Sequence, residues 1–512
     1  MVNTSENNKR IAKNTLLLYV RMLFTMAVSL YTSRVILNVL GVEDFGIYNV
    51  VGGVVAMFSL ISGALSSAIM RFITFELGTG NKENLKKVFS SAVTIQLAFA
   101  LIIVALAEAV GVWFLNIKMN IPEVRINAAN WVFQFSLLTF VINLISVPYN
   151  ASIIAHEKMS AFAYISIFEA VSKLALAFLI MISPIDKLVF YALLICSMAF
   201  IIRLIYGAYC KRNFEECNYK FIVDKVLLKR MFSFAGWNFI GSSSAILRDQ
   251  GGNVILNLFC GPISNAARGI SAQVNSAVYG FALNFMTALN PQIIKSYANK
   301  DFTYMMALIV QGARFSCYLL LILSLPILIN TQTILHLWLD IVPRYSVIFV
   351  QLTLIFAISE SISGPLITAT QATGRIRNYQ IVVGGIQMLN LPISYIILKN
   401  GGKPEALLVI AIALSQCCLF ARLYMLRRMI GLSIKKFIRK VYLNIIFVAL
   451  SSLVFPLIIY KKIVEHNFYV VIGISMLTVI CTILSILYIG CNNEERNFFI
   501  NKTKNLKKIF KI

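Results

Sequence analysis

The stretch SRVILNVLGVEDFGIYNVVGG, residues 33–53, has a counterpart in GNVILNLFCGPISNAARGISAQ, residues 252–273. Both contain Val-Ile-Leu-Asn, at 35–38 and 254–257, with a glycine shortly after it. Two weaker matches follow in the same order: a basic residue, Arg71 or Lys295, and an Asn-Lys-acid triplet at 81–83 and 299–301. Chance accounts for one match in a Val/Ile/Leu-rich chain, but three in order at near-constant spacing indicate a duplicated unit. The sequence therefore predicts two similar halves.

The composition defines the class of protein. Hydrophobic residues make up 59% of the chain and charged residues 13%, whereas an average soluble domain is about 25% charged. The mean hydropathy is +0.80. The net charge of +25 is spread over short segments between apolar runs, which is typical of membrane topology and not of a basic nucleic-acid-binding face. We therefore predict an all-α polytopic membrane protein with no nucleic-acid partner.

The apolar runs predict the topology, because a helix needs about 20 apolar residues to cross a membrane. Fourteen runs qualify: 12–33, 45–70, 88–115, 129–152, 161–183, 187–210, 231–258, 268–293, 304–330, 345–371, 380–398, 405–426, 441–460 and 468–490. Lys and Arg are about three times as frequent in one set of alternate loops, which includes both termini, so both termini are predicted in the cytoplasm. The repeat divides these spans into two six-helix lobes in parallel, 1–220 and 221–430, followed by a helix pair and basic tail, 431–512.

Polar residues recur along several predicted spans at helical spacing, as the walls of a transport path would require. The candidates for substrate binding are Arg21, Thr25, Ser29, Arg248, Asp249, Asn253, Gln273, Asn284 and Arg314. A charge at membrane depth is costly and usually faces a bundle interior or water. Arginine binds phosphate oxygens bidentately, so a cationic path predicts an anionic substrate, with an internal salt-bridge network as the alternative. Asp249 and Glu360 are candidates for ion or proton coupling.

Other charged residues within the spans have simpler interpretations. Glu169 and Lys173 have the spacing of an ion pair within one helix. Arg203 and Arg422 lie near the inner ends of their spans and are predicted to snorkel toward the aqueous phase. Nine Cys and three His show no metal-ligand spacing, so we expect no metal site and no cofactor. The basic linker of residues 427–440 suits either the anionic inner leaflet or simple topological anchoring.

The segment LGVEDFGIYNVV, residues 40–51, and the loop RFITFELGTGNKENLKKVFSSAV, residues 71–93, resemble bacterial polysaccharide transporters. These are the O-antigen flippase branch of the multidrug/oligosaccharidyl-lipid/polysaccharide exporter (MOP) superfamily. The resemblance implies a flippase that moves undecaprenyl-diphosphate-linked oligosaccharide from the cytoplasmic to the periplasmic leaflet of the bacterial inner membrane. It implies a cationic cavity for the diphosphate, with the lipid tail in the bilayer. We expect membrane lipids and other polysaccharide assembly proteins as partners, and a monomer.

Three alternatives remain at this point. A lipid II flippase would share fourteen helices and a basic lumen, and a multidrug/Na⁺(H⁺) antiporter of the same superfamily usually has twelve helices. A polysaccharide polymerase or ligase would need a large periplasmic loop, whereas the longest predicted outer segments are only 116–128 and 331–344. With no nucleophile–base arrangement in the sequence, we predict a transporter and not an enzyme. The sugar that it carries is not encoded in any motif of the chain.

Overall fold

The computed structural model describes residues 4–56, 59–117, 121–221, 224–339, 342–463 and 467–497. All regular structure in these ranges is helical, and eleven helical segments are long and apolar enough to cross a membrane. The chain is therefore an all-α polytopic membrane protein, as its composition predicts. The other three predicted spans, 45–70, 231–258 and 268–293, fall on helical runs in which hydropathy alone marks no separate crossing, so the count of fourteen stays a prediction.

The chain forms two compact units, and each is described by itself. Unit 1 comprises the chain up to Ser242 together with Ile294–Asp301. Its helices are α1 (Thr4–Ala56), α2 (Ser59–Thr79), α3 (Lys82–Leu106), α4 (Val112–Ile117), α5 (Ile126–Ala155), α6 (Met159–Leu179), α7 (Lys187–Asn213) and most of α8 (Lys225–Ile246). Short π- or 3₁₀-helical turns extend several of them: Ala107–Gly111, Glu123–Arg125, Ile180–Ile182 and Glu215–Cys217.

Unit 2 comprises Ser243–Ile293 and the chain from Phe302 onward. Its helices are α9 (Gly252–Ala298), α10 (Phe302–Trp338), α11 (Ser346–Thr373), α12 (Arg377–Met388), α13 (Asn390–Lys399), α14 (Ala406–Ile430), α15 (Ile434–Phe437), α16 (Asn444–Lys462) and α17 (Phe468–Ser485). The last turn of α9 belongs to unit 1. Three π-helical turns complete the unit: Leu247–Gly251, which is labelled η5, and Ile438–Leu443 and Ile486–Gly490.

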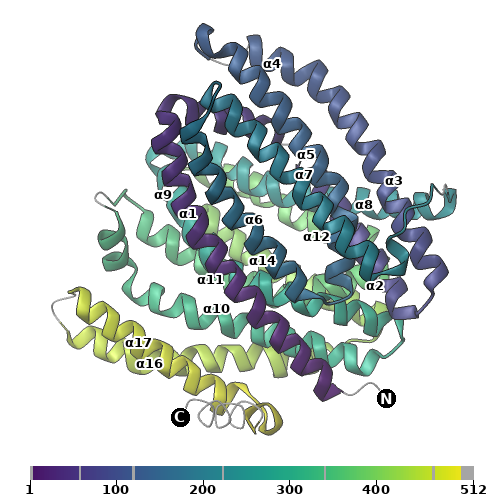
Figure 1. The fold of residues 1–512 in the computed structure, drawn as a ribbon. Coiled ribbons are helices and arrows are strands. Elements are labelled where there is room, and N and C mark those ends of the chain that lie inside the picture. The colour runs from purple at the N-terminus through teal and green to yellow at the C-terminus, as the bar shows by residue number, and fades with distance from the viewer. Residues whose placement is uncertain are drawn as a thin grey trace, which may run out of the picture. The chain divides into compact units, whose positions relative to one another are not determined.

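Local sequence explains how the helices of unit 1 begin and bend. α1 bends at Gly41, whose φ of 81° and ψ of 169° are adopted almost only by glycine. Asn81 caps α3 by accepting the amide hydrogen of Asn84 at 3.0 Å, and Asp186 caps α7 in the same way. Figure 1 shows α1 running beside α6, which it contacts along much of its length.

Two ionic clusters lie at opposite ends of α5 within unit 1. At its start, Arg125 pairs with Asp44 from α1 and, at 2.5 Å, with Asp186 at the start of α7. Beyond its end, the buried carboxylate of Glu157 receives Arg10 Nε at 2.8 Å and Lys295 Nζ at 2.7 Å. Charged contacts therefore join three sequence-distant segments at each end of the unit.

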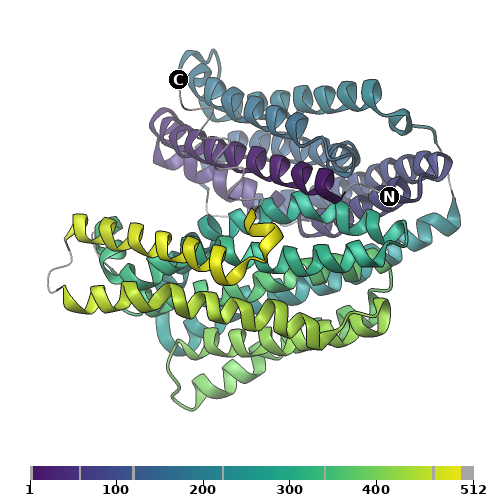
Figure 2. The ribbon, with the colours of Figure 1, turned by 90° about the horizontal axis from the view of Figure 1, so that it is seen from below.

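Unit 2 is built around α10, α11 and α14, with α16 and α17 side by side against α10 (Figure 2, yellow-green and yellow). Its largest buried side chains include Tyr318 and Phe349.

The basic linker of residues 427–440 is not one helix. α14 ends at Gly431, which has φ 74°, and Ser433 caps the short α15 that follows.

Candidate functional site

The first candidate group lies on α1 in unit 1. Arg21 Nη1 donates to Ser166 Oγ on α6 at 3.4 Å, and its guanidinium stacks 4.6 Å from the ring centre of Phe162. One turn along, Thr25 hydrogen-bonds the carbonyl of Met22 at 3.1 Å, and Ser29 is exposed. The predicted polar stripe therefore runs from an arginine held against α6 to an exposed serine.

The second group lies in unit 2 at η5, between α8 and α9. Arg248 binds the carboxylate of Asp249 with both arms of its guanidinium, Nε to Oδ1 at 3.0 Å and Nη2 to Oδ2 at 3.3 Å. The Arg248 side chain is 13% exposed, and that of Asp249 is 54% exposed. The arginine also stacks on Phe356, 5.0 Å from the ring centre. The guanidinium of Arg248 is therefore mostly buried, whereas the carboxylate of Asp249 is accessible.

A second arginine joins this pair. Arg268 Nη2 lies 3.3 Å from the backbone carbonyl oxygen and 3.7 Å from a carboxylate oxygen of Asp249. In a straight helix, residues this far apart in sequence would be separated by about 28 Å along the axis. The helical chain must therefore bend back between them. The second Val-Ile-Leu-Asn copy lies within this interval, and the first lies just before the bend at Gly41.

We name Arg248, Asp249 and Arg268 the arginine cluster. Its two guanidinium groups face one carboxylate, so it carries a net positive charge. Arg248 and Asp249 lie on a π-helical turn, a distortion that occurs frequently at functional sites. A Cβ on Gly252 would lie 3.1 Å from the side chain of Leu407, so this glycine permits close packing beside the cluster. An anion that binds the arginines would compete with an accessible carboxylate and not with a buried one.

The remaining candidates of α9 lie farther along the helix. Asn253 is partly buried one turn after Asp249. Gln273 lines an otherwise largely apolar cavity of about 240 Å³, together with Thr331 and Trp338. Asn284 donates to the carbonyl of its own helix at Gly280, at 2.9 Å.

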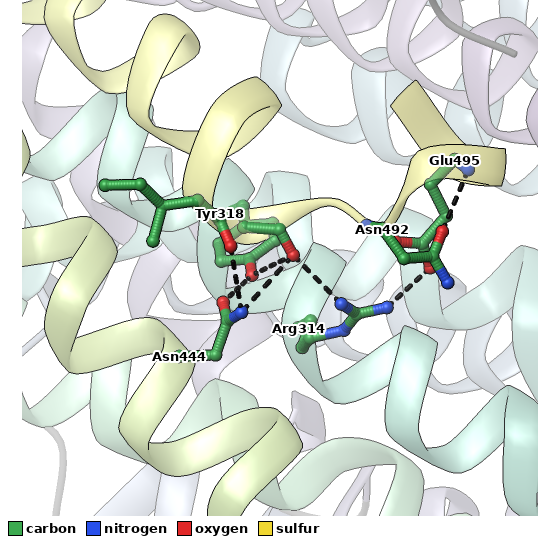
Figure 3. A network of polar contacts seen from close by, with 7 residues as sticks. Arg314, Tyr318, Asn444, Asn492 and Glu495 are labelled. Carbon is green, nitrogen blue, oxygen red and sulfur yellow. Dashed lines mark hydrogen bonds and ion pairs between the residues drawn. The ribbon is translucent and has the colours of Figure 1, made fainter. Parts of the chain in front are cut away.

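Arg314 lies on α10, and its guanidinium is held by the end of the C-terminal helix pair (Figure 3). Nη1 donates to the carbonyl of Gly490 at 2.9 Å, and Nη2 pairs with Glu495 at 2.5 Å. Tyr318 donates to the same carbonyl at 3.1 Å and to the side-chain oxygen of Asn444 at the start of α16. Arg314 therefore joins α10 to this helix pair, and its role in substrate binding stays a prediction.

Glu360, the second coupling candidate, belongs to a polar network inside unit 2. Ser415 Oγ donates to the carboxylate at 2.8 Å, and Arg422 lies 3.9 Å from it. Arg422 is 2% exposed and also donates to Tyr379 and Ser363, at 3.1 Å and 2.7 Å. The prediction that Arg422 snorkels is wrong, because side chains on two other helices, α11 and α12, bind it inside unit 2.

The outcomes for the other charges follow from local geometry. The predicted pair of Glu169 and Lys173 is confirmed at 2.6 Å. Arg268 begins the predicted span 268–293 and is not among the predicted site residues, but it contacts Asp249. The order of the spans could have indicated this contact, because a short turn between two spans brings the start of one opposite the end of the other.

Within the described residues, no group of three or more His, Cys, Asp or Glu side chains could hold a metal ion.

Comparisons with known proteins agree with this architecture. A family model described as polysaccharide biosynthesis protein matches residues 11–298. The uncharacterized membrane protein EpsK of Bacillus subtilis (strain 168) is 24% identical over 130 residues, which cover 25% of this chain and 26% of EpsK. The alignment thus spans about a quarter of that relative's length.

Two solved structures share the fold. An outward-facing multidrug resistance MATE family transporter of the MOP superfamily superimposes with a TM-score of 0.71 and 12% identity, covering 83% of this chain and 96% of that one. A MOP superfamily transporter from Pyrococcus furiosus Vc1 (DSM3638), whose binding pocket is described as having reversed polarity, gives 0.70 and 12% over the same shares. At such identities the likeness concerns the fold alone.

Proposed function

This chain belongs to the polysaccharide biosynthesis protein family and has the fold of MOP superfamily transporters, and from this premise we propose that it is a lipid-linked oligosaccharide flippase. Its substrate would be an undecaprenyl-diphosphate-linked repeat unit of an O-antigen or capsule. The protein would move this unit from the cytoplasmic to the periplasmic leaflet by alternating access. Multi-pass insertion in the bacterial inner membrane with both termini in the cytoplasm is part of the proposal.

The arginine cluster carries this proposal. A diphosphate needs closely spaced donors, and Arg248 and Arg268 both reach one carboxylate, Asp249. A guanidinium group can bind two phosphate oxygens at once, just as it binds the two oxygens of a carboxylate. The half-exposed Asp249 would hold the arginines in place until the diphosphate replaces it. Arg21, Thr25 and Ser29 in unit 1 remain candidates for substrate binding by themselves, as do Asn253, Gln273 and Asn284 in unit 2.

The residues of the arginine cluster separate this proposal from two of its three alternatives. A multidrug antiporter that binds cationic compounds would need exposed carboxylates in excess, whereas the cluster has two arginines to one aspartate. A lipid II flippase also carries a diphosphate, so the cluster does not distinguish it, and the sugar must do so. A polymerase or ligase would need catalytic groups that the cluster lacks. Transport of a lipid-linked diphosphate is therefore the class that the geometry supports best.

Coupling to an ion gradient is a separate part of the proposal. Glu360 has a hydroxyl donor at 2.8 Å and a buried arginine at 3.9 Å, so its carboxylate is held inside unit 2. Asp249 would couple in another way, because its carboxylate exchanges with the substrate. We infer that Asp249 or Glu360 couples transport to an ion gradient, and that membrane lipids and other polysaccharide assembly proteins are partners of a monomeric transporter.

The test is complementation in cells that lack their own O-unit flippase, scored as surface polysaccharide at matched membrane levels. Arg21, Arg248 and Arg268 would each be changed to Ala and to Lys. The control is Lys173→Gln, which removes a half-exposed cation already paired with Glu169. We expect loss with Ala, partial recovery with Lys, and full function of the control. Equal function of all variants would overturn the cationic path, and failure of the unchanged protein with matched O-units would overturn the substrate assignment.

A further inference from the structure

A cavity of about 720 Å³ opens in unit 2 where the turn after α11 meets the start of α12 and the end of α14. None of its lining residues is a candidate for the transport path. The side chains that define it are Arg375, Arg377, Val382, Tyr424, Met425 and Arg428. This cavity, which we name the basic pocket, is far larger than a water site and has no role in the proposed transport chemistry.

The charge of the basic pocket is of one sign. Three arginines line it, and no aspartate or glutamate is among its lining residues, all of which lie in the described part of the chain. Arg377 is also the first residue of α12, where the helix dipole adds positive potential and favours an anion. Arg428 donates to the hydroxyl of Tyr424 at 2.5 Å and lies 4.6 Å from its ring centre. Tyr424 therefore holds the guanidinium of Arg428 at the pocket.

The wall behind the arginines is apolar. Val382, Ala421, Met425 and Met429 line the pocket between α12 and α14. A free phosphate would use the arginines alone, whereas a lipid would place its phosphate on the arginines and its acyl chains along the wall. Basic pockets between membrane helices on the cytoplasmic side bind lipid headgroups in this manner. The combination of cations and apolar wall therefore favours a lipid.

The surrounding sequence places the basic pocket at the cytoplasmic boundary of the membrane. The predicted topology puts Arg375, Arg377 and Arg428 in cytoplasmic segments. The linker after α14 continues the same charge with Lys435, Lys436 and Arg439, all exposed. Anionic lipids of the inner leaflet attract such basic segments. This is the surface on which an anionic headgroup is available at high concentration.

We propose that the basic pocket is a binding site for an anionic glycerophospholipid of the cytoplasmic leaflet. Its headgroup phosphate contacts Arg375, Arg377 and Arg428, and an acyl chain lies against Val382 and Met425. A lipid bound to the folded state stabilises it by mass action. The site is independent of the transported substrate, so the proposal stands or fails without the flippase assignment.

The experiment uses the full chain purified in detergent and relipidated with phosphatidylglycerol or phosphatidylcholine. Native mass spectrometry counts the retained lipids, and thermal shift records the stabilisation. The test variant is R375Q/R377Q/R428Q, with R428Q alone as a milder second variant. The matched control, K435Q/K436Q/R439Q, removes the same charge from the exposed linker. We expect selective retention of phosphatidylglycerol by the unchanged protein and the control, and about tenfold weaker apparent affinity in the test variant, or 1.4 kcal/mol.

Competition identifies the source of the phosphate. Undecaprenyl phosphate and inorganic pyrophosphate are added separately to the phosphatidylglycerol-loaded protein. Retention of phosphatidylglycerol against both supports the proposal. Displacement by pyrophosphate alone would identify an anion site without lipid specificity, and displacement by undecaprenyl phosphate would make the pocket a substrate-loading site; either result overturns it. Equal loss of lipid in the test and control variants would also overturn it, because net charge would then explain binding.

Discussion

The carboxylate of Glu157 offers the sharpest quantitative test of unit 1. It lies in the tight turn between α5 and α6 with a φ of 59°, and its side chain is 3% exposed. It receives Lys295 Nζ at 2.7 Å from the end of α9 and Arg10 Nε at 2.8 Å from the start of α1. Glu157→Gln keeps the size of the side chain and removes only its charge.

The expected loss follows from the exposure of the partners. Removing one member of a buried ion pair costs about 3–5 kcal/mol. An exposed pair contributes only about 0–1 kcal/mol. Arg10 is 50% exposed and regains water when the carboxylate is lost, whereas Lys295 is 23% exposed and regains less. We therefore expect Glu157→Gln to weaken the local structure by about 2–3 kcal/mol, or about 30- to 150-fold in the opening equilibrium.

Hydrogen exchange in detergent measures this equilibrium. The amide of Lys158 donates to the carbonyl of Ile153, and the amide of Asp301 to that of Ser296, so both report opening of the turns around Glu157 and Lys295. Their exchange should accelerate 30- to 150-fold by the same conversion, about 1.4 kcal/mol for each factor of ten.

The control is Glu215→Gln. It removes a carboxylate of the same unit that is 69% exposed and lies 3.4 Å from Lys82, itself 77% exposed. A surface pair of this kind should change exchange by less than about fivefold. If the Glu157 and Glu215 variants exchange alike, the buried carboxylate does not hold these segments together and the reasoning fails.

Three further predictions test other contacts. Gly78→Ala should lower thermal stability by about 1–3 kcal/mol, since its Cβ would lie 2.7 Å from a side chain on the facing turn of α9, whereas Gly63→Ala meets open space and should not. Burial raises the pKa of Asp186, but hydrogen bonds from its arginine partner and backbone amides outweigh this and lower it. Its stabilisation is thus complete above about pH 4 and lost as pH falls through the lowered pKa, so Asp186→Asn should flatten the acid limb of a melting profile. Glu495→Gln should speed exchange at the end of α17, because it removes the carboxylate partner of Arg314.

Sequence alone predicts the class of fold, because hydropathy and charge distribution reflect the membrane directly. It also predicts local pairs such as Glu169 with Lys173, since helix geometry fixes residues four apart. The polar residues of the predicted span 231–258 identify Asp249 as a candidate. Composition and periodicity therefore predict single helices and which of their faces are polar.

The contacts that sequence analysis missed all depend on chain reversals or on distant helices. Arg268 reaches Asp249 because the chain bends back between them. Arg422 finds Tyr379 and Ser363 on two other helices. Arg314 is bound by Glu495, which follows the last predicted span. Periodicity within one helix contains no information about these partners, so depth in the membrane alone could not separate a structural arginine from a candidate for substrate binding.

The motif behind the family resemblance has a structural explanation in unit 1. Within residues 40–51, Gly41 supplies a backbone conformation that other residues rarely adopt, and Asp44 pairs with Arg125. Both residues shape the turn where α1 bends, and neither carries the positive charge that a diphosphate requires. The motif therefore specifies the scaffold of the fold. Among proteins that share it, preference for an anionic substrate should follow the arginines of α1 and the arginine cluster, so exchanging Arg248 and Arg268 should change the cargo where exchanging the motif residues changes stability.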